Sequence, residues 1–197
     1  MILMEDIIRE GNNLLKQKSA EVELPLSKAD EDTLVSMAEY IYNSVDEEVS
    51  VKYHLRPAVG LAAPQIGVLK KMIAILAPDE DGEEHEMILV NPKLLSYSDE
   101  LTYLKGGEGC LSVDREVKGL VHRPKRITFS AYFYEDGKLT FKKMRLKGYL
   151  AVVFQHEYDH LQGILFPDRI NETNPFFVPK NSTPVRFKGE EEDDTVK

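Results

Sequence analysis

Hydrophobic and polar residues alternate with two different periods along the 197 residues of this chain. From Ser27 to Val45 the apolar positions recur every three or four residues, and a serine followed by acids is typical of a helix start. The pattern predicts a surface helix that buries one face, formed by Leu34, Met37, Ala38, Ile41 and Val45. A second helix is predicted from the helical spacing of Tyr149, Val152, Val153, His156 and His160. Gly163 is expected to form its C-terminal cap.

The chain between these two helices favours β-strands. Two short apolar runs, 71–76 and 87–92, flank an Asp-Gly turn signal and predict a pair of strands. Apolar and polar residues alternate over 126–146 on both sides of a second Asp-Gly pair at 136–137, which predicts a β-hairpin. We therefore expect an α+β fold in which antiparallel β-sheets pack around a central helix that carries the two histidines.

Size, charge and cysteine content narrow the possible functions. A mass of 22.5 kDa with 42% hydrophobic residues is enough for one domain with a sizeable core. The net charge of -9 and the absence of a Lys/Arg-rich block argue against nucleic acid or an anionic membrane as primary partner. Neither a membrane-spanning run nor a secretory signal is found. The single cysteine, Cys110, excludes an intramolecular disulfide and favours the cytoplasm.

We expect one domain over residues 1–170 and a C-terminal extension over 171–197. The extension is rich in Asn, Pro and Lys, and it closes with GEEEDDTVK, which holds five acids and one lysine. This acidic end is predicted to be a mobile, solvated coil, and a tail that binds a partner is the alternative.

The second helix carries the motif HEYDH at 156–160. Residues four apart lie on the same helix face, so His156 and His160 can direct two nitrogens at one cation while Glu157 projects beside it. Two neutral ligands with an adjacent base are what a water-activating metal needs. The alternative, two ordinary polar histidines, is less favoured because a chance HExxH is uncommon in a chain with five histidines.

A catalytic metal usually takes a third protein ligand. One group of zinc peptidases continues HxxGxxH, but Phe166 stands where the last histidine would be. A carboxylate, Glu172 or Asp168, would define another zinc peptidase. Upstream, Cys110 lies in GGEGCLS, whose glycines permit close approach of the main chain to a ligand. A lone cysteine is usually a small buried hydrophobe, but a thiolate beside two imidazoles suits Zn(II) or Fe(II).

The segment 59–67, VGLAAPQIG, matches neither period and predicts a tight loop. Together with EGCLS at 108–112 and QHEYDH at 155–160, in this order, it resembles the three signature stretches of peptide deformylase of the bacterial type. The resemblance includes DIIREGN, NPKLL and RLKGY and extends over residues 6–170.

The resemblance implies a metal-dependent hydrolase that removes the formyl group from the N-terminal formylmethionine of nascent chains. One divalent ion, Fe(II) in the cell with nickel, cobalt or zinc as substitutes, would be held by Cys110, His156 and His160. Glu157 would act as the base, and the Gln65 amide and the Leu111 N–H would stabilise the oxyanion. The residues expected to contact the substrate are Val59, Gly60, Tyr149, Val152 and Val153, the last three with an alternative role in the helix core.

Four positions depart from the family pattern. Ala58 replaces a usual glycine, Asn13 and Lys118 replace usual prolines, and His122 replaces an apolar residue. These positions bear on substrate preference and rate rather than on chemistry, because none is an implied ligand, base or oxyanion donor. A deformylase-like binding module with little activity is the alternative from another class. Because the expected substrate is the end of a nascent chain, we expect the protein to act close to the ribosome.

Overall fold

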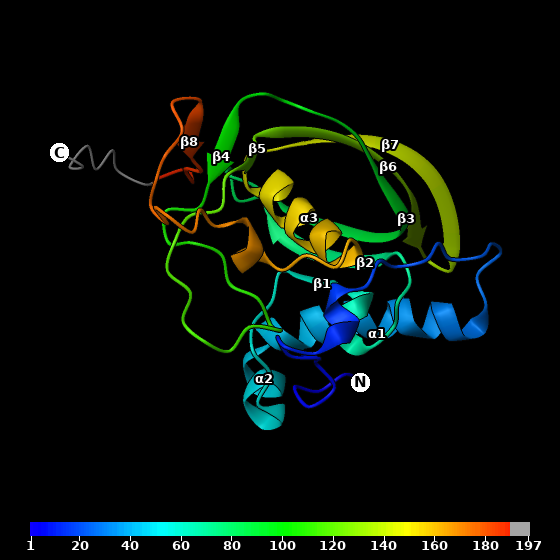
Figure 1. Ribbon diagram of the computed structural model, residues 1–197. Coiled ribbons are helices and arrows are strands. Elements are labelled where there is room, and N and C mark those ends of the chain that lie inside the picture. The colour runs from blue at the N-terminus through cyan, green and yellow to red at the C-terminus, as the bar shows by residue number, and fades with distance from the viewer. Residues whose placement is uncertain (190–197) are drawn as a thin grey trace.

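The computed structural model describes residues 1–189, which form an α+β fold with antiparallel strands (Figure 1). Its α-helices are α1 (Lys28–Val45), α2 (Glu47–Tyr53) and α3 (Gly148–Leu161). Three single 3-10 turns are η1 (Asn13–Lys16), η2 (Ala63–Ile66) and η3 (Phe166–Arg169). None of the helices within these residues has the length and apolar character that crossing a bilayer requires.

The strands form two sheets. The larger sheet is antiparallel with the order β1-β2-β3-β6-β7, and its strands are β1 (Gly60–Ala62), β2 (Met72–Pro78), β3 (Glu84–Tyr97), β6 (Arg126–Glu135) and β7 (Lys138–Lys147). The smaller sheet has the order β5-β4-β8, with β5 (Arg123–Pro124), β4 (Leu101–Tyr103) and β8 (Ser182–Pro184). In this sheet β4 pairs with β8 in parallel.

The two predicted strand pairs are confirmed. Strands β2 and β3 pair from Met72↔Val90 to Pro78↔Glu84. Strands β6 and β7 form the hairpin, and its two turn residues, Asp136 and Gly137, both have positive φ, as a two-residue hairpin turn requires. The prediction of a tight loop at 59–67 is wrong in part, because 60–62 form edge strand β1 and 63–66 form η2. Three residues are too few to establish an alternating pattern.

Helix α1 begins as predicted, with the Ser27 side chain accepting a hydrogen bond from the Asp30 amide. Its buried face includes Leu34, Met37 and Ile41, but Val45 is 57% exposed, contrary to the prediction. The helix ends at Val45, and the inward position of its last turn belongs to Ser44. The buried Ser44 hydroxyl donates to the Ile41 carbonyl and accepts the Ala58 N–H.

Helix α3 is buried on almost all sides, which explains its high content of apolar residues. It packs against β1 and β2, and the Phe154 ring lies 4.2 Å from the Phe129 ring of β6, measured between centroids. The predicted glycine cap is confirmed: Gly163 follows the helix with φ 75° and donates its N–H to the His160 carbonyl. The two histidines are thus held on a rigid element.

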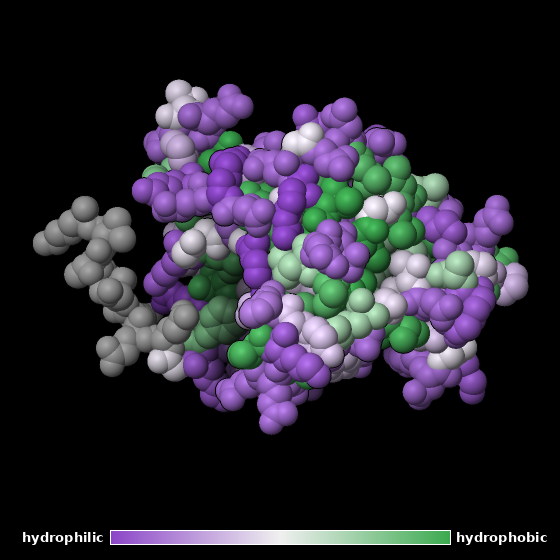
Figure 2. Space-filling model, turned by 90° about the horizontal axis from the view of Figure 1, so that it is seen from below, coloured by the Kyte–Doolittle hydropathy of each residue, from purple (hydrophilic) through white to green (hydrophobic). Residues whose placement is uncertain are grey.

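The extension that begins at 171 runs back along the molecule as far as it is described. Strand β8 lies beside β4 (Figure 1). The predicted mobile coil at the acidic end lies, from 190 on, outside the described residues. The face seen from below has a hollow with hydrophobic walls bordered by hydrophilic side chains (Figure 2).

Candidate active site

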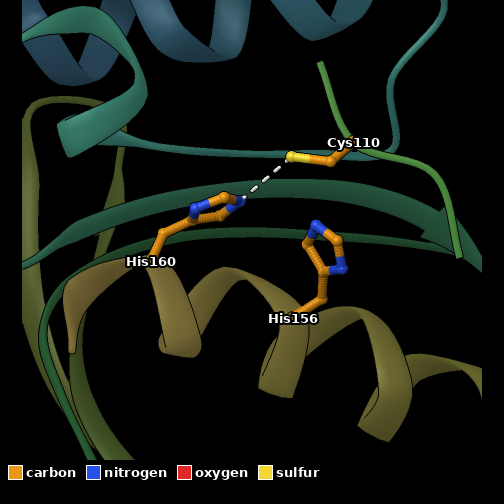
Figure 3. Close-up of side chains that lie close together, drawn as sticks. All are labelled: Cys110, His156 and His160. Atoms are coloured by element: carbon orange, nitrogen blue, oxygen red, sulfur yellow. Dashed lines mark hydrogen bonds between the residues drawn. The ribbon is translucent and has the colours of Figure 1, made fainter. Parts of the chain in front are cut away.

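Three potential metal ligands converge from two segments (Figure 3). Cys110 comes from the loop after β4, and His156 and His160 come from successive turns of α3. Their ligand atoms all lie within 4.8 Å of one another, and Cys110 Sγ is 3.3 Å from His160 Nε2. Metal–sulfur bonds of about 2.3 Å and metal–nitrogen bonds of about 2.0 Å at tetrahedral angles would put sulfur and nitrogen about 3.5 Å apart. The group is compact enough for one ion to contact all three.

The state of His160 suits a ligand. Burial and the neighbouring His156 hold the pKa of His160 well below its ordinary value, which favours the neutral imidazole that metals bind. The ring directs Nε2 at Cys110, while its buried Nδ1 has no hydrogen-bond partner among residues 1–189.

His156 is oriented by Glu108. The Glu108 carboxylate lies 2.7 Å from His156 Nδ1, which leaves Nε2 as the ring nitrogen for an ion. Burial lowers the pKa of His156, but hydrogen bonds with Cys110 and Glu108 outweigh it and raise this pKa well above its ordinary value. A carboxylate behind a histidine ligand fixes the ring and increases its basicity.

A buried ionic network supports this carboxylate. Arg123 donates to both oxygens of Glu108, at 2.7 and 2.9 Å, and to Asp159 at 2.8 Å; Asp159 also pairs with Arg169. Burial raises the pKa of Glu108, but Arg123 and His156 bring it down to about 2, so the carboxylate is ionised. None of these residues was predicted from the sequence to belong to the site. Glu108 and Asp159 stand within the recognised stretches beside the ligands, whereas Arg123 carried no signal.

Glu157 lies beside the ligands and is only 4% exposed. Burial raises the pKa of Glu157 to about 7, against the opposing charge of His156. Its Oε2 has no hydrogen-bond partner among the described residues. A Cβ on Gly60 would lie 2.4 Å from Glu157 Oε1, so only glycine at this position of β1 leaves room for the carboxylate. The carboxylate is thus confined near the ligands, with a pKa suited to proton transfer at neutral pH.

The Gln65 side chain has its amide end directed at the cluster. Its Oε1 accepts the Ala62 N–H at 2.9 Å, which requires Nε2 to face the other way. Nε2 lies 3.4 Å from Cys110 Sγ and 3.3 Å from Ser112 Oγ. Turn η2 therefore places a buried amide donor, Gln65 Nε2, beside the Cys110 thiol.

The peptide that links Cys110 to Leu111 is fixed by its carbonyl. The Cys110 oxygen accepts the Val113 N–H at 3.2 Å and Arg56 Nη2 at 3.3 Å. A trans peptide points its N–H opposite to its C=O, so the Leu111 N–H is directed away from these two donors.

These groups line one cleft of about 300 Å³. All five residues expected to contact the substrate are in its lining: Val59, Gly60, Tyr149, Val152 and Val153. Gln65, Leu111, Cys110, His156 and Glu157 line it as well. Among the other lining residues, Val45, Arg56, Pro57 and Leu104 were not predicted from the sequence to belong to a site. The cleft thus combines apolar walls with a few convergent polar groups, as ligand sites commonly do.

The carboxylates considered as alternative third ligands do not join this group. Asp168 accepts the Leu165 N–H at the start of η3, and Glu172 is exposed. Among residues 1–189, the group of potential ligands that contains the two histidines is completed by Cys110.

The four departures from the family pattern leave the cluster intact. Ala58 is in the cleft lining, and Asn13 and Lys118 are exposed. His122 contacts the C-terminal extension through both ring nitrogens.

A Cys-His-His group that could hold a cation, with an adjacent buried glutamate, lies in a cleft of an α+β domain, and this arrangement is typical of a metal-dependent hydrolase of the HExxH kind. The family model of polypeptide deformylase matches residues 4–176. The chain therefore belongs to the polypeptide deformylase family, whose members remove the formyl group from N-terminal methionine.

Individual relatives agree with this assignment. A peptide deformylase of Oceanobacillus iheyensis is 53% identical over 186 residues, which are 94% of this chain and 100% of the relative. Peptide deformylase 2 of Bacillus cereus is 53% identical and covers 94% of this chain and 99% of its own. Among solved structures, a probable peptide deformylase from Synechococcus phage S-SSM7 has a TM-score of 0.65 at 38% identity and covers 83% of this chain and 98% of its own. A Met-Ala-Ser-bound deformylase of Acinetobacter baumannii has a TM-score of 0.65 at 29% identity, with coverages of 83% and 96%.

Proposed function

We propose that this protein hydrolyses the formamide of N-terminal formylmethionine and releases formate and a free amine. The observation that carries the proposal is the convergence of Cys110 Sγ with nitrogens of His156 and His160 in the lining of an apolar cleft. In this proposal α3 is the central element of the fold, since it carries two ligands, the base and part of the cleft.

The donor set fits a divalent ion. One thiolate and two imidazoles suit a borderline-soft metal, and we propose Fe(II) in the cell, with nickel, cobalt or zinc as substitutes. When bound, such an ion would act as a Lewis acid, which lowers the pKa of a water molecule bound to it and polarises the formyl oxygen. The Glu108 carboxylate behind His156 supports this use of the site, because it leaves the opposite ring nitrogen for the ion.

Glu157 is the proposed proton carrier. Its unpaired Oε2 takes a proton from the attacking water as the water oxygen bonds to the formyl carbon. When the carbon–nitrogen bond breaks, the same carboxylic acid gives the proton to the leaving nitrogen. A pKa near 7 suits both steps, because the group can accept and release a proton at neutral pH.

Gln65 and Leu111 are the proposed oxyanion donors. Negative charge grows on the formyl oxygen as water adds, and donors that are already in place stabilise it without reorganisation. The Gln65 Nε2 is held by the bond between its Oε1 and Ala62, and the Leu111 N–H is fixed through the Cys110 carbonyl. Neither donor needs to move for the reaction.

The apolar side chains of the cleft are proposed to receive the methionine. Val59, Tyr149, Val152 and Val153 provide these walls. Strand β1 is at the edge of its sheet, so its outer edge is available to pair with an extended peptide. A peptide bound in this way would run past Gly60 with its first residue toward the ligands.

We further propose that residues 1–170 form the catalytic domain, with 171–197 as an extension of it. A substrate that exists on newly made chains implies action in the cytoplasm and close to the ribosome. The sequence relatives, which match at 53% identity over almost their whole length, support the same function.

The test is formate release from formyl-Met-Ala-Ser by protein loaded anaerobically with nickel, with metal content measured alongside. Cys110→Ala should lose metal and activity together, whereas Glu157→Gln should keep the metal and lose activity. A zinc peptidase would retain its metal in Cys110→Ala. A binding module would bind Met-Ala-Ser without turning over the formyl peptide, and this outcome would refute the proposed activity.

A further inference from the structure

The C-terminal extension is fastened to the catalytic domain by His122. His122 Nδ1 lies 2.7 Å from Ser182 Oγ, and His122 Nε2 lies 2.9 Å from the Phe177 carbonyl oxygen. It also packs against Tyr103 of β4, with ring centroids 5.0 Å apart. An apolar residue at 122 would provide neither hydrogen bond, so this departure from the family pattern has a structural use.

Main-chain hydrogen bonds hold the extension in β8, at Val185 and again at Lys188. Strand β8 pairs with β4, and the Val185 N–H donates to the Tyr103 carbonyl at 2.9 Å. Beyond it, the Lys188 N–H donates to the Glu80 carbonyl at 2.8 Å. Val185 is itself buried. The path of residues 182–188 is therefore fixed, and so is the place where Phe187 meets the domain.

Phe187 contacts Tyr149, a wall of the proposed methionine site. The two rings meet edge to face with centroids 5.1 Å apart. Behind the wall is a second hollow of about 260 Å³. It shares Leu104 and Tyr149 with the cleft and is bounded on its other side by Val185 and Phe187. Tyr149 thus separates two hollows, and Phe187 supports it from the far side.

We propose that Phe187 is a positioning residue that sets the selectivity of the cleft for methionine by holding Tyr149 in place. The inference rests on the proposed function. Without the Phe187 ring, Tyr149 can move into the second hollow and widen the cleft. Larger first residues would then fit, and methionine would lose contact with one wall. The extension acts as part of the substrate site, although no residue of 171–189 lines the cleft.

The experiment compares formyl-Met-Ala-Ser with formyl-Phe-Ala-Ser on nickel-loaded full-length protein. Phe187→Ala should lower the methionine-to-phenylalanine ratio of kcat/KM by about 3- to 10-fold, the range of one aromatic edge contact. The change should be in KM, because the groups that carry out the chemistry are untouched. Phe187→Leu should restore part of the ratio. Calorimetry with Met-Ala-Ser gives a readout without turnover, and binding should weaken in Phe187→Ala.

Two controls separate this role from a general effect on folding. Phe176→Ala removes an exposed ring from the same extension and should leave the ratio unchanged. In a Tyr149→Ala background, Phe187→Ala should have no further effect on the ratio, because its action passes through Tyr149. A wild-type ratio in Phe187→Ala, or the full effect in the Tyr149→Ala background, overturns the inference. Failure of the wild-type protein to turn over either peptide refutes the proposed function instead.

Discussion

Glu108 accepts a hydrogen bond at 2.7 Å on the side of the His156 ring that faces away from Cys110. Arg123 holds the same carboxylate with two hydrogen bonds, so the orientation of a potential metal ligand is set by a buried pair. Arg123 and His156 lower the pKa of this carboxylate to about 2, so it is ionised at neutral pH. His156 is therefore held in one orientation before any ion arrives.

Replacing Glu108 with glutamine should weaken metal binding. Loss of a carboxylate behind a histidine ligand typically costs about 10- to 100-fold in affinity. Zinc affinity of Glu108→Gln, measured by competition with a chelator, should fall within this range. Thermal unfolding must be followed too, because Arg123 would keep only Asp159 as a charged partner, and breaking a buried ion pair costs about 3–5 kcal/mol. Glu100→Gln, which breaks the exposed pair with Arg126, is the matched control. Unchanged zinc affinity in a folded Glu108→Gln would contradict this role.

A methyl group at position 60 should disable the base without removing the metal. In Gly60→Ala the new carbon would lie 2.4 Å from Glu157 Oε1, so the carboxylate must move. Displacement of a catalytic group by about 1 Å can cost about 100-fold in rate, and we expect a loss of that order in kcat. Zinc content should not change. Gly106→Ala is the control, because a Cβ there meets nothing within 4 Å. Wild-type kcat in Gly60→Ala would show that Glu157 is not confined by β1.

Much of the fold follows from local patterns in the sequence. The hairpin at 126–147 has a period-two pattern and a turn that glycine and aspartate specify, and both are present in the structure. Helix α1 was predicted from its cap and stripe, apart from Val45, whose exposure depends on where the helix ends. The short strands β1, β4, β5 and β8 could not be predicted, since two or three residues carry no period and pairing partners are distant in sequence.

The candidate site also has parts that local sequence patterns predict and parts that they do not. The three potential metal ligands were predicted because HExxH and EGCLS are local stretches, and the structure brings Cys110, His156 and His160 together. Arg123 in β5 and Glu108 in a loop are 15 residues apart in the sequence, so no local sequence pattern indicates their ion pair. The same holds for the contact of Phe187 with Tyr149, which depends on how the extension folds back.

Activity should rise with pH through the titration of Glu157. Burial raises the pKa of this acid from 4.5 to about 7. A base must be deprotonated, so kcat/KM should fall as the pH drops through this pKa. A cation on the adjacent ligands lowers the pKa again, which puts the midpoint of the acid limb between the two values. Metal content must be measured at each pH, since protonated ligands also release the ion. A midpoint at or below 4.5 with the metal retained would contradict this assignment of the base.

The proposed Fe(II) form should be less durable in air than the nickel form. Fe(II) reacts readily with oxygen and peroxide, and the thiolate beside it is then exposed to oxidation to sulfenic and higher acids. Activity of the iron-loaded protein should decay under air and more slowly with catalase, while the nickel-loaded protein should keep its activity. Cys110 is the single cysteine, so peptide mass spectrometry can assign the oxidised product to it. Equal lifetimes of the two forms, or inactivation with an unmodified Cys110 and retained iron, would rule out oxidation at this ligand as the cause.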